Sequence, residues 1–161
     1  MNTIEFNGRI ADGSGVFRQQ IGLPTNLLSG YEDWMSEFVQ GTLNIQLSIA
    51  ELPSEFHSFG LRFLDLNEAF PPKIYRVSSD IENNTIQPSS ANPRRGDLQL
   101  WRAVLVNHQT KTKHKCFLMR RVESGYRDKA EILGECNYRE KCGFLNYHQV
   151  TVTVYADAQE T

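Results

Sequence analysis

Cysteine is scarce in this chain, with three residues among 161, an odd number, at positions 116, 136 and 142. They do not show the short paired spacing of zinc ligands, and the four histidines are equally scattered. The composition therefore argues against a disulfide-stabilised fold and against a structural zinc site.

Long apolar runs are also missing. Runs such as FLM at 117–119 are far shorter than the roughly 20 residues that a membrane-spanning helix needs. Residues 1–5 (MNTIE) lack the basic and then apolar pattern of a secretory signal. We therefore expect a soluble, cytoplasmic protein with no membrane partner.

The overall composition is that of a globular domain, with 40% hydrophobic and 22% charged residues. We expect a single domain over residues 1–161 with one core. Its most irregular part is residues 71–96, where prolines, asparagines and serines interrupt every pattern except a short strand-like IYRVS. This segment is interpreted as an inserted loop, either a cover for a ligand or partner or a passive connection.

Apolar and polar residues alternate along most of the chain, which predicts strands. A capping box formed by Ser29 and Glu32 predicts a short helix over about 30–39, and one formed by Asn137 and Glu140 predicts another that ends near Gly143. The predicted strands lie at 3–10, 41–48, 60–65, 74–78, 98–106, 115–122, 130–133 and 149–155. Without alternation of strands and long helices, the expected fold is mainly β: a compact, closed antiparallel β-barrel with two or three short helices.

Charge is unevenly distributed, although the net charge is only -2. Residues 1–70 carry three basic against nine acidic side chains, whereas residues 111–129 carry seven basic against two acidic ones. A basic segment of this kind attracts phosphate-bearing ligands or nucleic acid, or it is a solvated hairpin. Among Phe, Tyr and Trp it contains only Phe117 and Tyr126, too few interleaved aromatic residues to favour nucleic acid.

Three groups of residues could bind a ligand. The glycine turn Gly13-Ser14-Gly15 could hold an anion with its backbone N–H groups, or it is a simple β-turn. Thr42 and Asn44 project from one face of a strand, where they could bind Mg²⁺ beside a nucleotide or form a polar strand face. The third group could recognise a flat polar ligand or be surface turns, and comprises Ser124, Tyr126, Glu131, Asn137, Tyr138 and Arg139.

In order and spacing, these pieces resemble the archaeal CTP-dependent riboflavin kinase family. The resemblance rests on GRIADGSG at 8–15, LP at 23–24 and GTLNIQL at 41–47, and more loosely on 116–121, Tyr126, EIL at 131–133, YRE at 138–140 and the strand at 150–154. GTLN is its most specific part. The resemblance implies a six-stranded cradle-loop barrel.

The resemblance also implies three subsites. Thr42 and Asn44 would hold Mg²⁺. The nucleotide, CTP or another nucleoside triphosphate, would contact Gly13, Ser14, Gly15, Val16, Phe17, Arg18, Cys136, Asn137, Tyr138 and Arg139. The flavin would contact Glu123, Ser124, Tyr126 and Glu131. No residue is assigned as catalytic.

The expected function is therefore that of a phosphotransferase that moves a nucleotide γ-phosphate to riboflavin and produces FMN. Phe17 stands where the family tends to have glycine, so that a bulky ring replaces a close backbone approach to phosphate. This keeps open the alternative of a non-catalytic flavin- or nucleotide-binding barrel.

Overall fold

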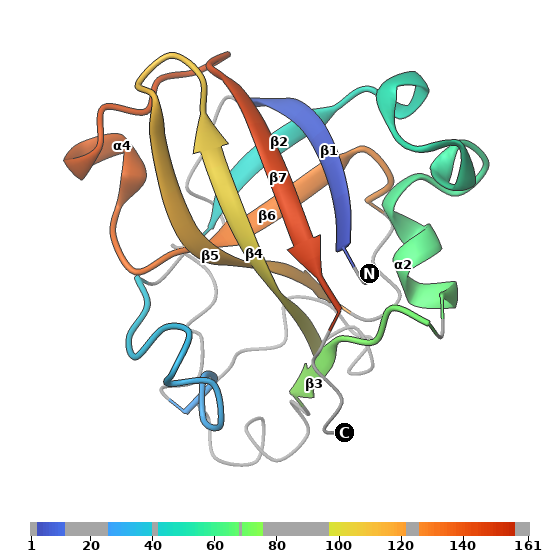
Figure 1. Cartoon of the computed structure of the whole chain (residues 1–161), viewed down its shortest axis with the longest axis horizontal. Coiled ribbons are helices and arrows are strands. Elements are labelled where there is room, and N and C mark those ends of the chain that lie inside the picture. Colours follow the sequence, from blue (N-terminus) through green and yellow to red (C-terminus); the bar gives the residue numbers. More distant parts are fainter. Residues whose placement is uncertain are drawn as a thin grey trace, which may run out of the picture.

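Six antiparallel strands form a closed barrel (Figure 1). The computed structural model describes residues 3–11, 26–39, 42–67, 69–75, 97–121 and 126–156. Its strands are β1 (Thr3–Ile10), β2 (Leu43–Leu47), β3 (Lys73–Tyr75), β4 (Leu98–Asn107), β5 (Thr112–Arg121), β6 (Lys129–Leu133) and β7 (Gln149–Tyr155). The order around the barrel is β4-β5-β6-β2-β1-β7, and β7 returns to pair with β4. The closed, mainly β barrel expected from the sequence is thus confirmed.

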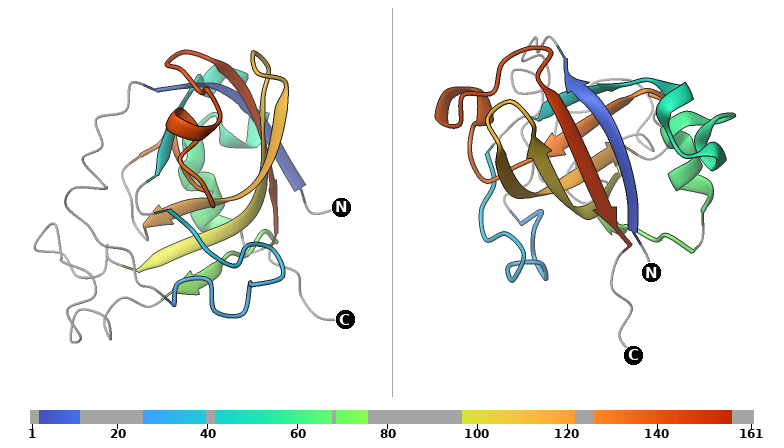
Figure 2. Two further views of the ribbon diagram at one scale, coloured as in Figure 1. Left: turned by 90° about the vertical axis from the view of Figure 1, so that its left-hand side faces the viewer. Right: turned by 45° about the horizontal axis from the view of Figure 1, so that its top comes forward.

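The two edges of β4 explain how a seventh strand is accommodated. β5 pairs along the whole of one edge of β4, from Leu98 to Asn107. The other edge is shared, because β3 pairs with residues 98–100 and β7 with residues 103–107. Figure 2 shows β1 and β7 side by side, and these two strands pair over seven residues on each.

The barrel interior is filled by the apolar half of each alternating strand. On β2 the buried residues are Leu43, Ile45 and Leu47, and on β7 they are Val150, Val152 and Val154. Gly8 lets β1 lie close against β2, since a Cβ at this position would stand 2.6 Å from both the Gln46 carbonyl oxygen and the Ile45 side chain. The alternation of apolar and polar residues along the strands therefore directs the apolar side chains into the core and the polar side chains to the outer wall.

Part of β5 is buried on both faces, from Cys116 to Arg120. Its outer face is covered by residues 26–39, where the Tyr31 ring stacks on Phe117 at 5.7 Å between centroids. Trp34 donates a hydrogen bond from Nε1 to the Cys116 carbonyl oxygen at 2.8 Å. This segment packs as a cover on the barrel wall.

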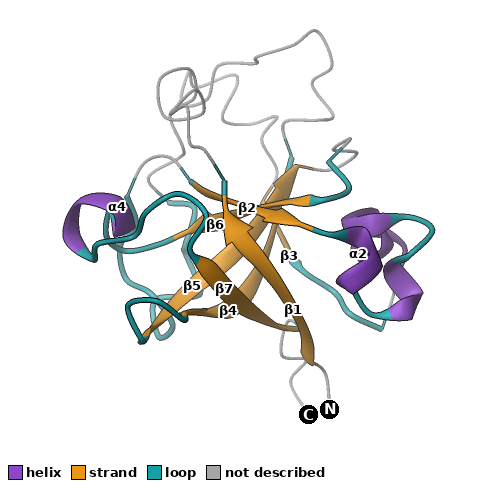
Figure 3. Ribbon diagram, turned by 90° about the horizontal axis from the view of Figure 1, so that it is seen from above, coloured by secondary structure: helices purple, strands orange, loops and turns teal. Residues whose placement is uncertain are grey.

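The described helices are short and lie outside the barrel. They are α2 (Phe63–Leu66), α4 (Tyr138–Lys141) and three 3-10 helices, Ile49–Glu51, Ser54–Phe56 and Gly60–Arg62. Seen from above, α2 and α4 lie on opposite sides of the barrel (Figure 3). The predicted cap of α4 is confirmed, because Asn137 Oδ1 accepts hydrogen bonds from the backbone N–H groups of Arg139 and Glu140.

Two predicted elements are wrong. The helix expected over 30–39 is a series of turns, in which Gly30 has a φ of +91° and the buried Tyr31 is held by stacking on Phe117 of β5 rather than by a regular helix. The strand expected over 60–65 is a 3-10 helix followed by α2. Leu61 and Leu64, three positions apart, are both buried, and this spacing is helical rather than that of a strand.

The β4–β5 hairpin is longer than expected, because pairing continues to Asn107 and Thr112 and leaves only residues 108–111 as the turn. The Asn107 side chain accepts hydrogen bonds from the backbone N–H groups of Gln109 and Thr110, which replaces part of the polar loop by a tight turn. Of the irregular segment 71–96, the structure describes residues 71–75, including β3. The rest of that segment lies outside the described residues.

Candidate functional site

Three of the side chains selected from the sequence meet on the outer wall at β2 and β6. Asn44 lies directly opposite Glu131 in antiparallel register, so both side chains leave the sheet on the same side. Thr42 immediately precedes β2 and donates a hydrogen bond from Oγ1 to Glu131 Oε1 at 3.2 Å. We call Thr42, Asn44 and Glu131 the oxygen cluster. It brings together residues that the resemblance assigned to the metal and to the flavin.

Burial governs the electrostatics of Glu131. It raises the pKa of this carboxyl group because the charged form is poorly solvated there. The hydrogen bond from Thr42 lowers this pKa, as do the nearby positive charges of Arg121, Arg120 and Lys129. Together they do not cancel the effect of burial, so the pKa stays above its ordinary value. Burial thus favours the neutral carboxyl form, and a cation bound next to it would favour the carboxylate.

Asn44 supplies the clearest sign of a missing partner. Its side-chain oxygen Oδ1 is almost completely buried and accepts no hydrogen bond. A buried acceptor without a partner costs about 1–3 kcal/mol, a cost that proteins usually avoid unless the group has a use. The backbone of Asn44 is satisfied, because its carbonyl oxygen accepts from Ala11 N at 2.9 Å.

The oxygen cluster has a donor set that suits a hard divalent cation. Mg²⁺ prefers oxygen ligands, and Thr42 Oγ1, Asn44 Oδ1 and the Glu131 carboxyl group are all oxygen donors. The Thr42 hydroxyl gives its single hydrogen to Glu131, which leaves its lone pairs available for a cation. The residues present therefore fit the metal that the resemblance implies.

The residues around α4 are joined to the oxygen cluster through Ala11. Arg139 donates from Nη2 to the Ala11 carbonyl oxygen and from Nη1 to Asn146 Oδ1, each at 2.6 Å. Ala11 N in turn donates to the Asn44 carbonyl oxygen. The predicted nucleotide segment on α4 and the predicted metal residues are thus two hydrogen bonds apart, with Ala11 between them.

Two predicted contact residues have contrasting environments. Tyr138 is buried and packs against Phe144 and His114, each at 5.1 Å between ring centroids. Its hydroxyl group has no hydrogen-bond partner. Tyr126 is 49% exposed, with Lys129 Nζ 5.3 Å from its ring centroid, and can offer a ring face to a flat ligand.

The remaining predicted contacts cannot be compared with the structure. Eight of them lie outside the described residues: Gly13, Ser14, Gly15, Val16, Phe17, Arg18, Glu123 and Ser124. Ala11 and Tyr126 are the nearest described neighbours of these two groups in the chain.

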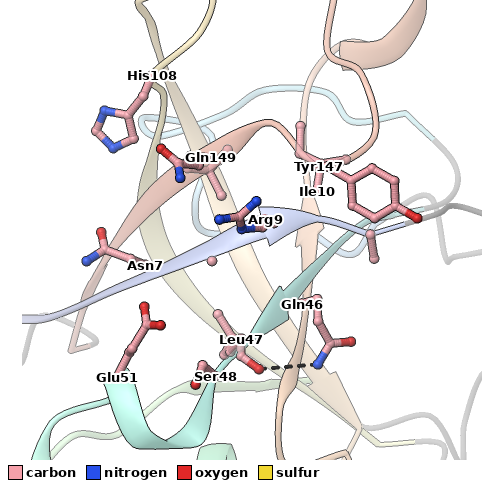
Figure 4. Close-up of a pocket in the computed structure, with 13 residues that line it drawn as sticks. Asn7, Arg9, Ile10, Gln46, Leu47, Ser48, Glu51, His108, Tyr147 and Gln149 are labelled. Atoms are coloured by element: carbon pink, nitrogen blue, oxygen red, sulfur yellow. Dashed lines mark hydrogen bonds between the residues drawn. The ribbon is translucent and has the colours of Figure 1, made fainter.

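A pocket that the sequence analysis missed lies on the outer wall over β1 (Figure 4). It has a volume of about 780 Å³. Its central row comes from three strands, because Arg9 is paired in register with Gln46 on one side and Gln149 on the other. Polar side chains at its rim are Asn7, Ser48, Glu51, His108 and Tyr147. The alternation of apolar and polar residues along β1 and β7 places polar side chains on the outer wall, and this is the sequence signal that indicates the pocket.

Several cations of the basic segment interact with the protein itself. Arg120 is buried and donates to the Tyr126 carbonyl oxygen. Lys115 Nζ lies 4.7 Å from the Trp34 ring centroid, and Arg127 donates to the Ser58 and Phe59 carbonyl oxygens. These contacts favour a structural role for part of the segment over a continuous basic surface.

Comparisons with known proteins give no family assignment: neither the models of protein families nor the curated proteins include a match to this sequence. Within the part of the chain that the structure describes, no three histidine, cysteine or acidic side chains gather as a metal site. Among the described helices, none has the length and apolar character needed to cross a membrane.

Proposed function

We propose that this protein is a riboflavin kinase-like phosphotransferase that moves the γ-phosphate of CTP, or of another nucleoside triphosphate, to the terminal ribityl hydroxyl of riboflavin. The product is FMN. The observation that carries the proposal is the oxygen cluster with its unpaired Asn44 Oδ1, located where the GTLN resemblance calls for a metal. An enzyme that draws on cellular nucleotides in this way would act in the cytoplasm.

In this proposal Thr42 Oγ1 and Asn44 Oδ1 would hold Mg²⁺, which would neutralise charge on the nucleotide phosphates. Both protein donors are neutral, so the anionic phosphates complete the charge balance. Glu131 orients the Thr42 hydroxyl through the observed hydrogen bond. Its carboxyl group would also contact the flavin. Phosphoryl transfer of this kind depends on positioning more than on a strong general base, and none is assigned.

Arg139 is a positioning residue here. Its two terminal nitrogens already donate to Ala11 and Asn146, so it holds Ala11 next to α4. Asn137 fixes α4 itself through its capping bonds. The nucleotide would lie between the glycine turn and the oxygen cluster, and Tyr126 would supply a ring face to the flavin.

A non-catalytic flavin- or nucleotide-binding barrel is the second candidate. Phe17 favours it, because a bulky side chain in the glycine turn opposes close approach of phosphate. The same oxygen cluster would then bind a cation and ligand without turnover. Nucleic acid is a weaker third candidate, given how many basic side chains interact with the protein itself.

The deciding experiment mixes the protein with riboflavin, Mg²⁺ and either CTP or ATP, and measures FMN by chromatography. Formation of FMN supports the kinase. Flavin fluorescence quenching without FMN supports the binding module, and the absence of both contradicts either form of the proposal. Salt-insensitive binding of nucleic acid would exclude the basic segment as a phosphate-binding surface.

Variants then test the metal assignment. Thr42→Ala and Asn44→Ala should each lower the FMN rate by at least about tenfold, the scale expected when a ligand of a catalytic cation is lost. Thr153→Val is the matched control, since Thr153 also donates a hydrogen bond from its hydroxyl group to a carboxylate, Glu5, away from the oxygen cluster. Equal rates in all three variants would contradict the assignment of Thr42 and Asn44.

A further inference from the structure

Two of the three cysteines lie against each other at the ends of α4. Cys136 comes directly before the capping residue Asn137, and Cys142 follows the last residue of the helix. Their Sγ atoms are 3.6 Å apart, and both side chains are half-buried, neither engaged in a disulfide. The third cysteine, Cys116, is fully buried on β5.

The shape of α4 explains why the two thiols meet. The helix is a single turn, closed by hydrogen bonds from Lys141 N to the Asn137 carbonyl oxygen and from Cys142 N to the Tyr138 carbonyl oxygen. Gly143, with a φ of +72°, then turns the chain back on itself. The backbone therefore holds both ends of the helix near each other, independently of any bond between the sulfur atoms.

A disulfide bond requires the sulfur atoms to approach to about 2.05 Å. Starting from 3.6 Å, this approach is about 1.5 Å, which is within the range of side-chain rotation at two half-buried positions. We propose that Cys136 and Cys142 are a redox modification site, which oxidises reversibly to an intramolecular disulfide that locks α4. This inference does not depend on the proposed kinase activity.

The reaction balances with a small disulfide oxidant such as glutathione disulfide. One cysteine thiolate attacks a sulfur of the oxidant, forms a mixed disulfide and releases one thiolate of glutathione. The second cysteine thiolate attacks the protein sulfur of that mixed disulfide and releases the other glutathione. The two protein thiols lose two electrons and two protons in total, and a reducing dithiol reverses the change.

The environment of the two cysteines sets the rate at which they oxidise. Burial raises the pKa of Cys136 to about 11, with further contributions from Cys142 and Glu135 and an opposing one from Lys141. Because the thiolate is the attacking species, the modification should be slow near neutral pH and accelerate as the pH rises. Slow oxidation of this kind suits a site that responds to a sustained oxidising environment.

Locking α4 has a consequence that can be measured. The helix carries Arg139, whose guanidinium group holds the Ala11 carbonyl oxygen, and Tyr138, which packs into the wall. A covalent link between the two ends of the helix restricts its opening. Amide hydrogen exchange at Lys141 and Cys142 should therefore slow by at least about tenfold in the oxidised protein.

The test incubates the folded chain with glutathione disulfide, blocks remaining thiols with iodoacetamide and maps tryptic peptides. Trypsin cuts after Arg139 and Lys141, so the two cysteines fall in different peptides that only a disulfide can join. The expected result is a joined pair and a loss of about 2 Da from the intact protein, reversed by dithiothreitol. Cys116 should be alkylated only after unfolding.

Matched variants complete the design. Cys136→Ser and Cys142→Ser should each abolish the joined peptides and the gain in exchange protection, while the wild-type protein shows both. The proposal is overturned if glutathione remains attached to a single cysteine, if the link forms only in denaturant, if Cys116 takes part, or if oxidation leaves α4 exchange unchanged.

Discussion

Replacing Asn44 by leucine should make the metal-free protein more stable. The side-chain oxygen of Asn44 is buried and unpaired, so the folded state bears its desolvation cost without a hydrogen bond in return. Leucine has a similar size and no polar group, and the backbone bond from Ala11 N to the residue-44 carbonyl oxygen is unaffected. Removing the unpaired acceptor should stabilise the fold by about 1–3 kcal/mol.

For a chain of this length, 1 kcal/mol corresponds to about 2–4 °C in Tm. We therefore expect Asn44→Leu to melt about 2–12 °C above wild type in EDTA, as measured by calorimetry. Excess Mg²⁺ should raise the Tm of wild type, because a cation that binds only the folded state stabilises it, and should leave Asn44→Leu unchanged.

Gln46→Leu is the matched control. Gln46 lies on the same face of β2, two residues further on, but it is exposed and donates hydrogen bonds to the Leu47 and Asp128 carbonyl oxygens. Its replacement should have no effect or reduce the Tm slightly. A lower Tm for Asn44→Leu than for Gln46→Leu in EDTA would refute the reasoning from the unpaired oxygen.

Two further predictions concern the neighbourhood of the oxygen cluster and the barrel wall. Burial raises the pKa of Glu131 in the folded state, so its contribution to stability is complete below the ordinary value of 4.5 and is lost as the pH rises through the folded pKa. Glu131→Gln, which keeps an acceptor for Thr42, should therefore match wild type in Tm near pH 4 and exceed it increasingly toward pH 7 in EDTA; a constant difference over that range would contradict the pKa shift. Gly8→Ala places a methyl group 2.6 Å from the Gln46 carbonyl oxygen and should destabilise the fold by about 1–3 kcal/mol in urea unfolding, whereas an unchanged midpoint would show that β1 and β2 can separate.

The barrel was predictable because its strands alternate regularly. The valines of β7 and the leucines of β2 mark the inner face so clearly that their bounds agree with the structure within two residues. The strand expected over 60–65 overlooks a local signal, the helical spacing of the buried Leu61 and Leu64, whereas the helix expected over 30–39 is wrong because tertiary packing outweighs local pattern. Tyr31 stacks on Phe117, a residue far along the chain, and no local signal could show that this contact replaces a helix.

The candidate site was predictable in its residue types but not in its geometry. Thr42 and Glu131 are 89 positions apart, and their hydrogen bond follows from the register of β2 on β6, which the sequence does not specify. The same holds for Arg139 and Ala11, 128 positions apart. The capping box predicts the short helix and its end near Gly143, but the proximity of Cys136 and Cys142 depends on that helix having a single turn, which the pattern does not specify.

The pairing of β1 with β7 also constrains how the protein acquires its structure. Thr3 lies opposite Tyr155, so the first and last strands of the barrel meet only after nearly all of the described chain has been synthesised. Contacts of such large sequence separation close long loops and slow folding relative to helical proteins. During synthesis on the ribosome, β2 keeps one unpaired edge until β6 emerges, and β1 keeps one until β7 emerges. The free edge of β1 is therefore the one that a chaperone would most usefully protect.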